Sequence, residues 1–279
     1  MTILLVGFDS AWTVANSGAI VGVLRSDNKS YRNLGAPQTV NFLEAEEVIL
    51  DWQGEYLPRA TIVTLDQPTI VVNDNGQRPV EKIVCSVVSR RHGGMQPAFK
   101  RRSEMFGNDA PIWPFLRRFG GPADPLKPIE GTRVFETYPV LAMIALGWVL
   151  PDSRSAGRLP KYNPARRKTF SISDWRYVCQ LASDAFDKHA LLDIARWISD
   201  AGQIASPRKK DQDCLDACLC LLVAFYLAEK KECLMVGDGQ SGYIVVPRGA
   251  ALREELEIRC KQIQLEPSQF VRVLTMSFP

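Results

Sequence analysis

The stretch TILLVGFDSAW at residues 2–12 decides the fold that this sequence predicts. Ile3 to Phe8 form an almost uninterrupted apolar run, which ends at Asp9. A run of this length without polar alternation is typical of a strand that is covered on both faces, at the centre of an α/β sheet. A carboxylate at the end of such a strand can bind a metal, hold a proton or cap the turn that follows. The rest of the sequence has to decide among these roles.

The composition bounds the class of protein. The chain has 279 residues, of which 46% are hydrophobic, enough for one large domain or one domain with an insertion. The net charge of +3 is too small to identify a partner. Seven cysteines without metal-type spacing, three of them inside the apolar stretch 214–228, indicate buried thiols and a reducing cytoplasm. That stretch is too short to span a bilayer, and no basic region precedes the first apolar run, so we expect neither a membrane partner nor a signal peptide.

Periodic patterns predict the remaining elements. Apolar runs predict strands over 18–24, within 31–41, over 60–65 and over 132–136, the first of them in an antiparallel hairpin with residues 2–12. Helical spacing predicts helices over 42–52, 140–148 and 211–229, and two helices within 173–201. Residues 233–236 and 243–246 predict a second hairpin, which an amphipathic helix over 250–263 follows.

The domain organisation follows from these elements. Residues 69–131 are rich in Gly, Pro and Arg, and we expect them to form a long irregular insertion or lid. The prediction is therefore one α/β domain over 1–248, with its insertion at 69–131, and a C-terminal helix and tail over 249–279.

Acidic residues recur where ligands bind in such folds. Asp9 and Asp66 each close a buried strand, and the crossover between them is long enough for a parallel return, so both would emerge at the carboxyl edge of the sheet. Asp213 and Asp216 are three residues apart and share one face of the predicted buried helix. Crowded charges on an apolar helix are costly unless a cation lies between them, and Mg²⁺ prefers such oxygen ligands.

Each of these residues also has a simpler interpretation. Asp66 can be a turn former, and Asp213 can be a residue of the first helical turn that the macrodipole favours. Asp216 lies deeper in the apolar run and is harder to explain without a ligand. Trp12 is either a core residue or a surface on which a base or sugar stacks.

The order of these features resembles the ribonuclease H-like nuclease and Holliday-junction resolvase superfamily. More narrowly, the segments GFDSAW, TLDQP, FETYP, KYNP and DCLDACLCLLVAF are similar to the bacterial and archaeal family of unknown function four-twenty-nine, described as predicted nucleases of ribonuclease H fold. The resemblance spans Leu4 to about Pro247. It implies a mixed five-stranded sheet flanked by helices.

The resemblance also implies a catalytic centre. It implies metal-bound carboxylates at Asp9 and Asp66, and at Asp213, Asp216 or both, with two Mg²⁺ or Mn²⁺ ions and phosphodiester hydrolysis as the reaction. Such nucleases usually take a Glu from the helix after the third strand, for which Glu44, Glu46 and Glu47 are all candidates. Glu136, which closes the strand in FETYP, is the alternative catalytic carboxylate, and the sequence leaves this choice open.

Basic residues suggest the partner. They cluster in the insertion and in a loop before the helices at 173–201, and basic loops around an acidic cleft suit a nucleic acid, whose backbone charge dominates affinity. The predicted nucleic-acid-binding residues are Arg90, Arg91, Arg101, Arg102, Lys161, Arg166 and Lys210.

The sequence thus predicts a metal-dependent nuclease that acts on DNA or RNA. One alternative is a non-catalytic nucleic-acid-binding module that keeps the fold. A second is an actin-like phosphotransferase, which would need two such domains with glycine-rich phosphate turns, whereas this chain holds one copy.

Overall fold

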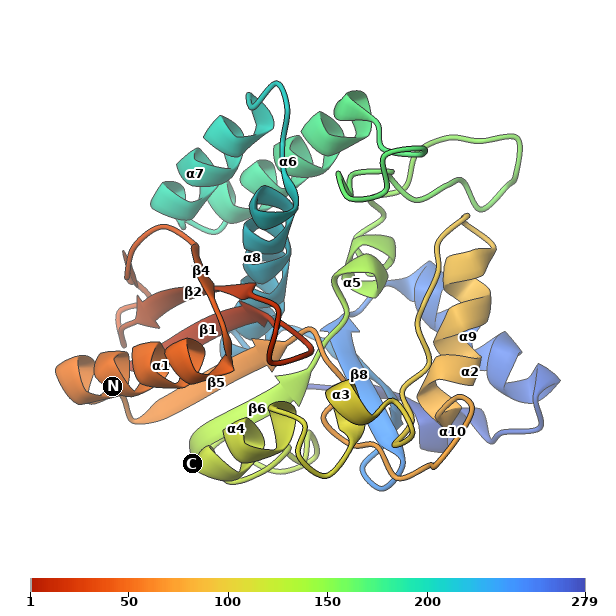
Figure 1. Ribbon diagram of the computed structural model, residues 1–279, viewed down its shortest axis with the longest axis horizontal. Coiled ribbons are helices and arrows are strands. Elements are labelled where there is room, and N and C mark those ends of the chain that lie inside the picture. The colour runs from red at the N-terminus through yellow and green to blue at the C-terminus, as the bar shows by residue number, and fades with distance from the viewer. Residues whose placement is uncertain (1, 279) are drawn as a thin grey trace.

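The computed structural model describes residues 2–278, and these form an α/β fold around a mixed six-stranded sheet (Figure 1). The strand order is β3-β2-β1-β5-β6, with β4 also paired to β2. β1 is antiparallel to β2 and parallel to β5, which is in turn parallel to β6. The strands are β1 (Ile3–Asp9), β2 (Gly18–Arg25), β3 (Tyr31–Asn33), β4 (Gln38–Val40), β5 (Ala60–Leu65) and β6 (Gly131–Glu136).

The predicted buried strand is the centre of this sheet. Every residue of β1 is buried, which confirms the prediction from its apolar run. The described sheet has six strands where five were expected, because the segment after β2 forms two short strands, β3 and β4, that both pair with β2. The arrangement of parallel and antiparallel strands is consistent with a ribonuclease H-like fold.

Helices cover both faces of the sheet. One face packs against α1 (Phe42–Tyr56) and α4 (Ile112–Arg118), and the other against α8 (Lys209–Ala228), which carries the predicted Asp pair. The remaining helices are α2 (Pro79–Ser89), α3 (Ser103–Phe106), α5 (Pro139–Ala145), α6 (Ile172–Asp187), α7 (Leu192–Gly202), α9 (Ala250–Gln262) and α10 (Pro267–Phe270). The two helices expected within 173–201 are α6 and α7.

Helix α8 lies unusually close to the sheet. A Cβ atom at Gly7 in β1 would stand 2.1 Å from the carbonyl oxygen of Ala217 and 2.3 Å from the backbone nitrogen of Leu221. Thr64 in β5 donates a 2.6 Å hydrogen bond from its Oγ1 to the carbonyl oxygen of Cys220. The helix therefore packs backbone against backbone, and the cysteines of this helix are free and buried as expected.

The insertion contains more regular structure than the sequence suggested. The segment 69–131 is irregular over most of its length, as expected, but α2, α3 and α4 all lie within it. Helix α2 begins with Pro79 at its first turn, and its buried apolar residues recur at helical spacing. The buried residues of α2 include Val80, Ile83, Val84, Val87 and Val88.

The C-terminal segment also differs from the prediction. The expected hairpin is present as β7 (Cys233–Asp238) and β8 (Gly242–Pro247), and β9 (Val271–Leu274) adds to it on the other side of β7. Residues 249–278 contain the expected helix as α9, and the segment after it adds β9, which completes a second described sheet in the order β8-β7-β9. Within residues 2–278, no helix is both long and apolar enough to cross a membrane.

Candidate active site

The ends of β1 and β5 hold Asp9 and Asp66 side by side. Phe8 is aligned with Leu65 in the parallel pair, and the backbone nitrogen of Asp66 donates a 2.9 Å hydrogen bond to the carbonyl oxygen of Phe8. Because side chains alternate along a strand, the next residues, Asp9 and Asp66, both point toward the face that α8 covers. The sequence prediction that these two residues meet at the carboxyl edge of the sheet is therefore confirmed.

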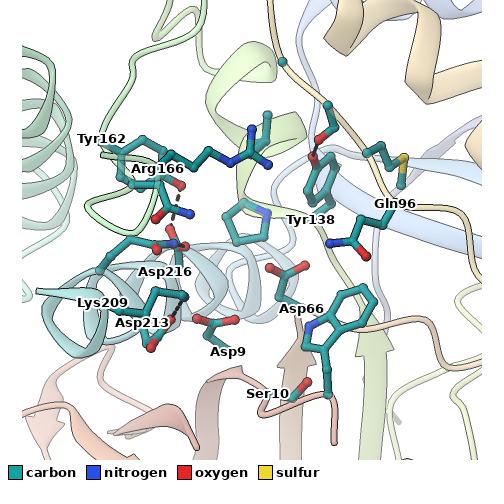
Figure 2. Close-up of a pocket in the computed structure, with 18 of the residues that line it drawn as sticks. Asp9, Ser10, Asp66, Gln96, Tyr138, Tyr162, Arg166, Lys209, Asp213 and Asp216 are labelled. Atoms are coloured by element: carbon teal, nitrogen blue, oxygen red, sulfur yellow. Dashed lines mark hydrogen bonds and ion pairs between the residues drawn. The ribbon is translucent and has the colours of Figure 1, made fainter. Parts of the chain in front are cut away.

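Helix α8 brings the second pair of carboxylates to the same place. Asp213 and Asp216 are buried, and Figure 2 shows them facing Asp9 and Asp66 around one pocket. The Tyr162 hydroxyl donates a 2.7 Å hydrogen bond to Oδ1 of Asp216. Lys209 forms an ion pair with Asp213, one helical turn away. All four predicted aspartates thus lie in one site.

Burial and mutual repulsion disfavour the ionised forms of these carboxyl groups. Burial, and then the Asp216 and Asp66 carboxylates, raise the pKa of Asp9 well above its ordinary value. Burial and the Asp216 carboxylate do the same to the pKa of Asp66. Burial raises the pKa of Asp216 to about 6, against the opposing influence of Lys209 and of the hydrogen bond from Tyr162. The site carries more negative charge than the protein itself compensates.

The aspartates lie in a cleft of about 770 Å³. Its other polar residues include Lys209, Lys210 and Gln212 from the start of α8, Lys161, Tyr162 and Arg166 from the loop before α6, and Tyr138 at the start of α5. Two buried side chains link the ends of the strands, since the Ser10 hydroxyl donates a hydrogen bond to Oε1 of Gln67.

The carboxylates of the cleft suit a divalent cation that takes only some of its ligands from the protein. Over residues 2–278, no three His, Cys, Asp or Glu side chains form a ready cluster for one metal ion. Mg²⁺ commonly uses one or two carboxylates and completes its shell with water and substrate phosphate. Asp9 and Asp66 suit that role because no hydrogen bond from a described side chain reaches their carboxylates, whereas Asp213 and Asp216 are already bonded to Lys209 and Tyr162.

Glu136 lines the same cleft as the four aspartates but has different hydrogen-bond partners. It is aligned with Leu65, one residue before the row that holds Asp66, and the pleat therefore directs it to the opposite face. Both of its carboxylate oxygens are bonded to Arg78, at 2.6 Å and 3.0 Å, and the Thr69 backbone nitrogen donates to it at 2.9 Å. Glu136 lines the cleft as part of a buried ion pair with Arg78, which favours a structural role for it.

The other candidate glutamates lie elsewhere. They belong to α1, which packs on the face of the sheet opposite to α8. Glu44 bonds to the backbone nitrogen of Asn41 as part of a capping box, Glu46 pairs with Arg118 at 3.3 Å, and Glu47 is exposed. None of the three lines the cleft, so none completes the site.

The predicted basic residues separate into two groups. Lys161, Arg166 and Lys210 line the cleft. Arg91 is buried, and its guanidinium group pairs with both carboxylate oxygens of Glu255, which removes it from any surface that a nucleic acid can reach. The remaining three do not line the cleft, and they are Arg90, Arg101 and Arg102.

Sequence reasoning missed three polar partners of the aspartates. Lys209 precedes Asp213 by four residues and Gln212 precedes Asp216 by four, the spacing at which helical side chains meet. The contacts of Lys209 and Gln212 could therefore have been predicted from a correct start of α8. Tyr162 lies in the segment KYNP, but nothing in the sequence shows that this loop folds over α8.

Comparison with known proteins gives one match. The model of a family described as "Protein of unknown function (DUF429)" matches residues 7–239, which include all four aspartates of the cleft. A search of curated proteins and a search of solved structures each found no match.

Proposed function

The chain belongs to this family of proteins of unknown function, and we propose from the site itself that it is a metal-dependent nuclease, which hydrolyses phosphodiester bonds of DNA or RNA. The observation that carries the proposal is the convergence of Asp9, Asp66 and Asp216 on one cleft, where burial and neighbouring carboxylates raise the pKa of each. A site of this charge is stabilised by divalent cations, which can activate water for the hydrolysis of a phosphodiester bond.

The residues of the cleft suggest a division of roles. Asp9 and Asp66 would hold the ions, with Asp216 as a further ligand that Tyr162 orients through its hydrogen bond. Bound Mg²⁺ or Mn²⁺ supplies an activated water and stabilisation of the leaving oxygen. Lys161, Arg166 and Lys210 line the same cleft and suit the phosphates of the substrate.

The test is a cleavage screen with labelled single-stranded, duplex, hybrid and branched nucleic acids in Mn²⁺ or Mg²⁺. We expect cleavage of at least one class, which EDTA abolishes. Asp66→Asn and Asp216→Asn should each lower the rate at least about 100-fold. Asp200→Asn is the matched control, because Asp200 is an exposed residue of α7 outside the cleft, and it should keep the parental rate. Parental rates in both site variants would contradict the assignment.

A second candidate is a nucleic-acid-binding module without catalysis. The ion pair between Lys209 and Asp213 favours it, because this lysine already neutralises one carboxylate of the site. Under this alternative, binding persists in EDTA, none of the four substrate classes is cut, and titration calorimetry shows no uptake of Mn²⁺. Under the nuclease proposal, Mn²⁺ binds, and Asp66→Asn weakens that binding.

A further inference from the structure

The cleft has two chemically different sides. Arg166 and Lys209 lie on one side of Asp66, and Gln96 reaches in from the other (Figure 2). Lys161 and Lys210 also line the cleft. Gln96 belongs to the insertion, against which Trp12 and Met105 pack, and these side chains and Met95 line the cleft without carrying charge. The carboxylates lie between a cationic side and a side made of an indole ring, two thioethers and an amide.

Trp12 packs against the insertion at this uncharged side. It follows the end of β1 by three residues and has a left-handed backbone conformation, with φ of 62°, which is uncommon for a bulky residue. Its ring packs edge-on against Phe106, with centroids 5.9 Å apart. Phe106 belongs to a small cluster with Val71 and Ala98 that is separate from the two main cores. The insertion therefore fixes the ring, while the ring itself lines the cleft.

The polar atoms beside Trp12 remain available for a ligand. No described residue accepts a hydrogen bond from the Trp12 indole nitrogen, in contrast to Trp113, which bonds to the carbonyl oxygen of Gly107 at 2.7 Å. Oε1 of Gln96 accepts a 2.7 Å hydrogen bond from Arg102, and the amide nitrogen is directed into the pocket (Figure 2). A flat apolar ring and an amide donor that line the same cleft match the face and the edge of a nucleobase.

We propose that Trp12 and Gln96 bind an unpaired base of the substrate, so that the cleft accepts a single-stranded or locally unpaired nucleic acid and not a closed duplex. The base stacks on Trp12 and meets the amide of Gln96, while the cationic side binds the phosphates. A volume of about 770 Å³ lies in the usual range of small-ligand pockets and holds a nucleotide or two. A base inside a duplex is stacked and paired, and cannot lie on the ring. This inference rests on the proposed function, because it names the substrate class of the same cleft.

The test measures binding in EDTA, where no cleavage intervenes, by fluorescence anisotropy. The probes are a labelled short single strand, the same strand with abasic positions, and its duplex. We expect the single strand to bind more tightly than the duplex. Trp12→Leu should weaken binding of the intact strand about tenfold and leave the abasic strand unaffected, and Trp12→Phe should retain most of the affinity.

Two further variants separate stacking from loss of structure. Trp113→Leu removes a tryptophan that packs against the same cluster without lining the cleft, and it should not change the affinity for either strand. Gln96→Ala alters an exposed side chain, so the fold tolerates it, and it should weaken binding of the intact strand by about two- to tenfold. If Trp12→Leu unfolds, the Gln96 variant and Trp12→Phe still decide the question.

The outcomes distinguish this inference from the proposed function. Equal losses on intact and abasic strands, tighter binding of the duplex, or no binding of any strand would overturn the base platform. If the protein cleaves nucleic acid and Trp12→Leu binds the intact strand as tightly as the parent, the protein is a nuclease that does not stack a base on Trp12. Conversely, base-dependent binding through Trp12 in a protein that cuts nothing would support the platform and refute the hydrolysis.

Discussion

Gly7 of β1 lies directly against the backbone of Ala217 in α8, at a distance that excludes any side chain at position 7. This contact sets the separation between the sheet and the helix. Asp9 lies two residues after Gly7, and Asp216 immediately precedes Ala217. The approach of Asp9 to Asp216 therefore depends on Gly7, which has no side chain.

Gly7→Ala should destabilise the protein strongly. The added methyl would stand 2.1 Å from the Ala217 carbonyl oxygen, and neither backbone can give way cheaply. We expect a loss of about 3 kcal/mol in the free energy of unfolding, measured by urea denaturation. Gly54→Ala is the matched control, because Gly54 lies in α1 with open space around it and should gain about 0.5–1 kcal/mol from better helix propensity. Equal effects of the two changes would contradict the close packing.

The metal-free site should make stability depend on pH. The pKa of Asp216 is about 6 in the folded protein against an ordinary value of 3.8, so folding favours its protonated form. Its contribution to stability is fully present below pH 3.8 and is lost as the pH rises through about 6. The pKa values of Asp9 and Asp66 are shifted in the same direction.

Asp216→Asn should remove this loss of stability at rising pH. Its amide oxygen can still accept the hydrogen bond from Tyr162. Gln212 donates from Nε2 to Asp216 in the parent, and a turn of its amide by about 180° would present Oε1, which has no partner among the described residues, to the new amide nitrogen. In EDTA above pH 6, we expect the variant to melt at a higher temperature, with a gain of at most about 3 kcal/mol. Asp200→Asn should melt like the parent. Added Mn²⁺ should narrow the difference, and a parent that is stabilised by rising pH in EDTA would contradict the site electrostatics.

Glu136→Gln should separate a structural role from a catalytic one. The ion pair with Arg78 is buried on both sides, so the change leaves the guanidinium group with an incomplete partner and should cost several kcal/mol in urea denaturation. The rate per folded molecule should stay within a few-fold of the parent in the conditions where Asp66→Asn is inactive. A loss as large as that of Asp66→Asn, in protein shown to be folded, would return Glu136 to the active site.

The sequence was sufficient to predict where Asp9 and Asp66 lie, but not the direction of the Glu136 side chain. Uninterrupted apolar runs identify β1 and β5, and a parallel crossover brings the residues after them to one edge, so Asp9 and Asp66 follow from pattern alone. The direction of Glu136 depends on whether β6 ends one residue earlier or later relative to β5, and a shift of one residue reverses the face. Its partner Arg78 lies in the insertion, where Gly- and Pro-rich flanks obscured the regular apolar spacing of α2.

The C-terminal strand shows a different limit. The strand Val271–Leu274 is four residues long. Among the described strands it pairs only with β7, which lies more than thirty positions earlier in the chain. A segment this short has no periodicity that separates strand from loop, and its structure depends on the partner strand. The insertion helices were missed because their local apolar spacing was overlooked. The strand β9 was missed because its sequence carries no local signal.

Arg166→Gln should weaken the binding of nucleic acid and reduce its dependence on salt. Arg166 lines the cleft beside the carboxylates, where a guanidinium group can contact a phosphate and release a counterion. In a plot of log affinity against log salt concentration, its loss should reduce the slope by about 1 on every sequence tested. Arg101→Gln removes the same charge from an exposed site that does not line the cleft and should leave the slope nearly unchanged. If Arg101 proved to matter as much as Arg166, the bound strand would have to extend over the insertion, and the binding surface would be larger than the cleft.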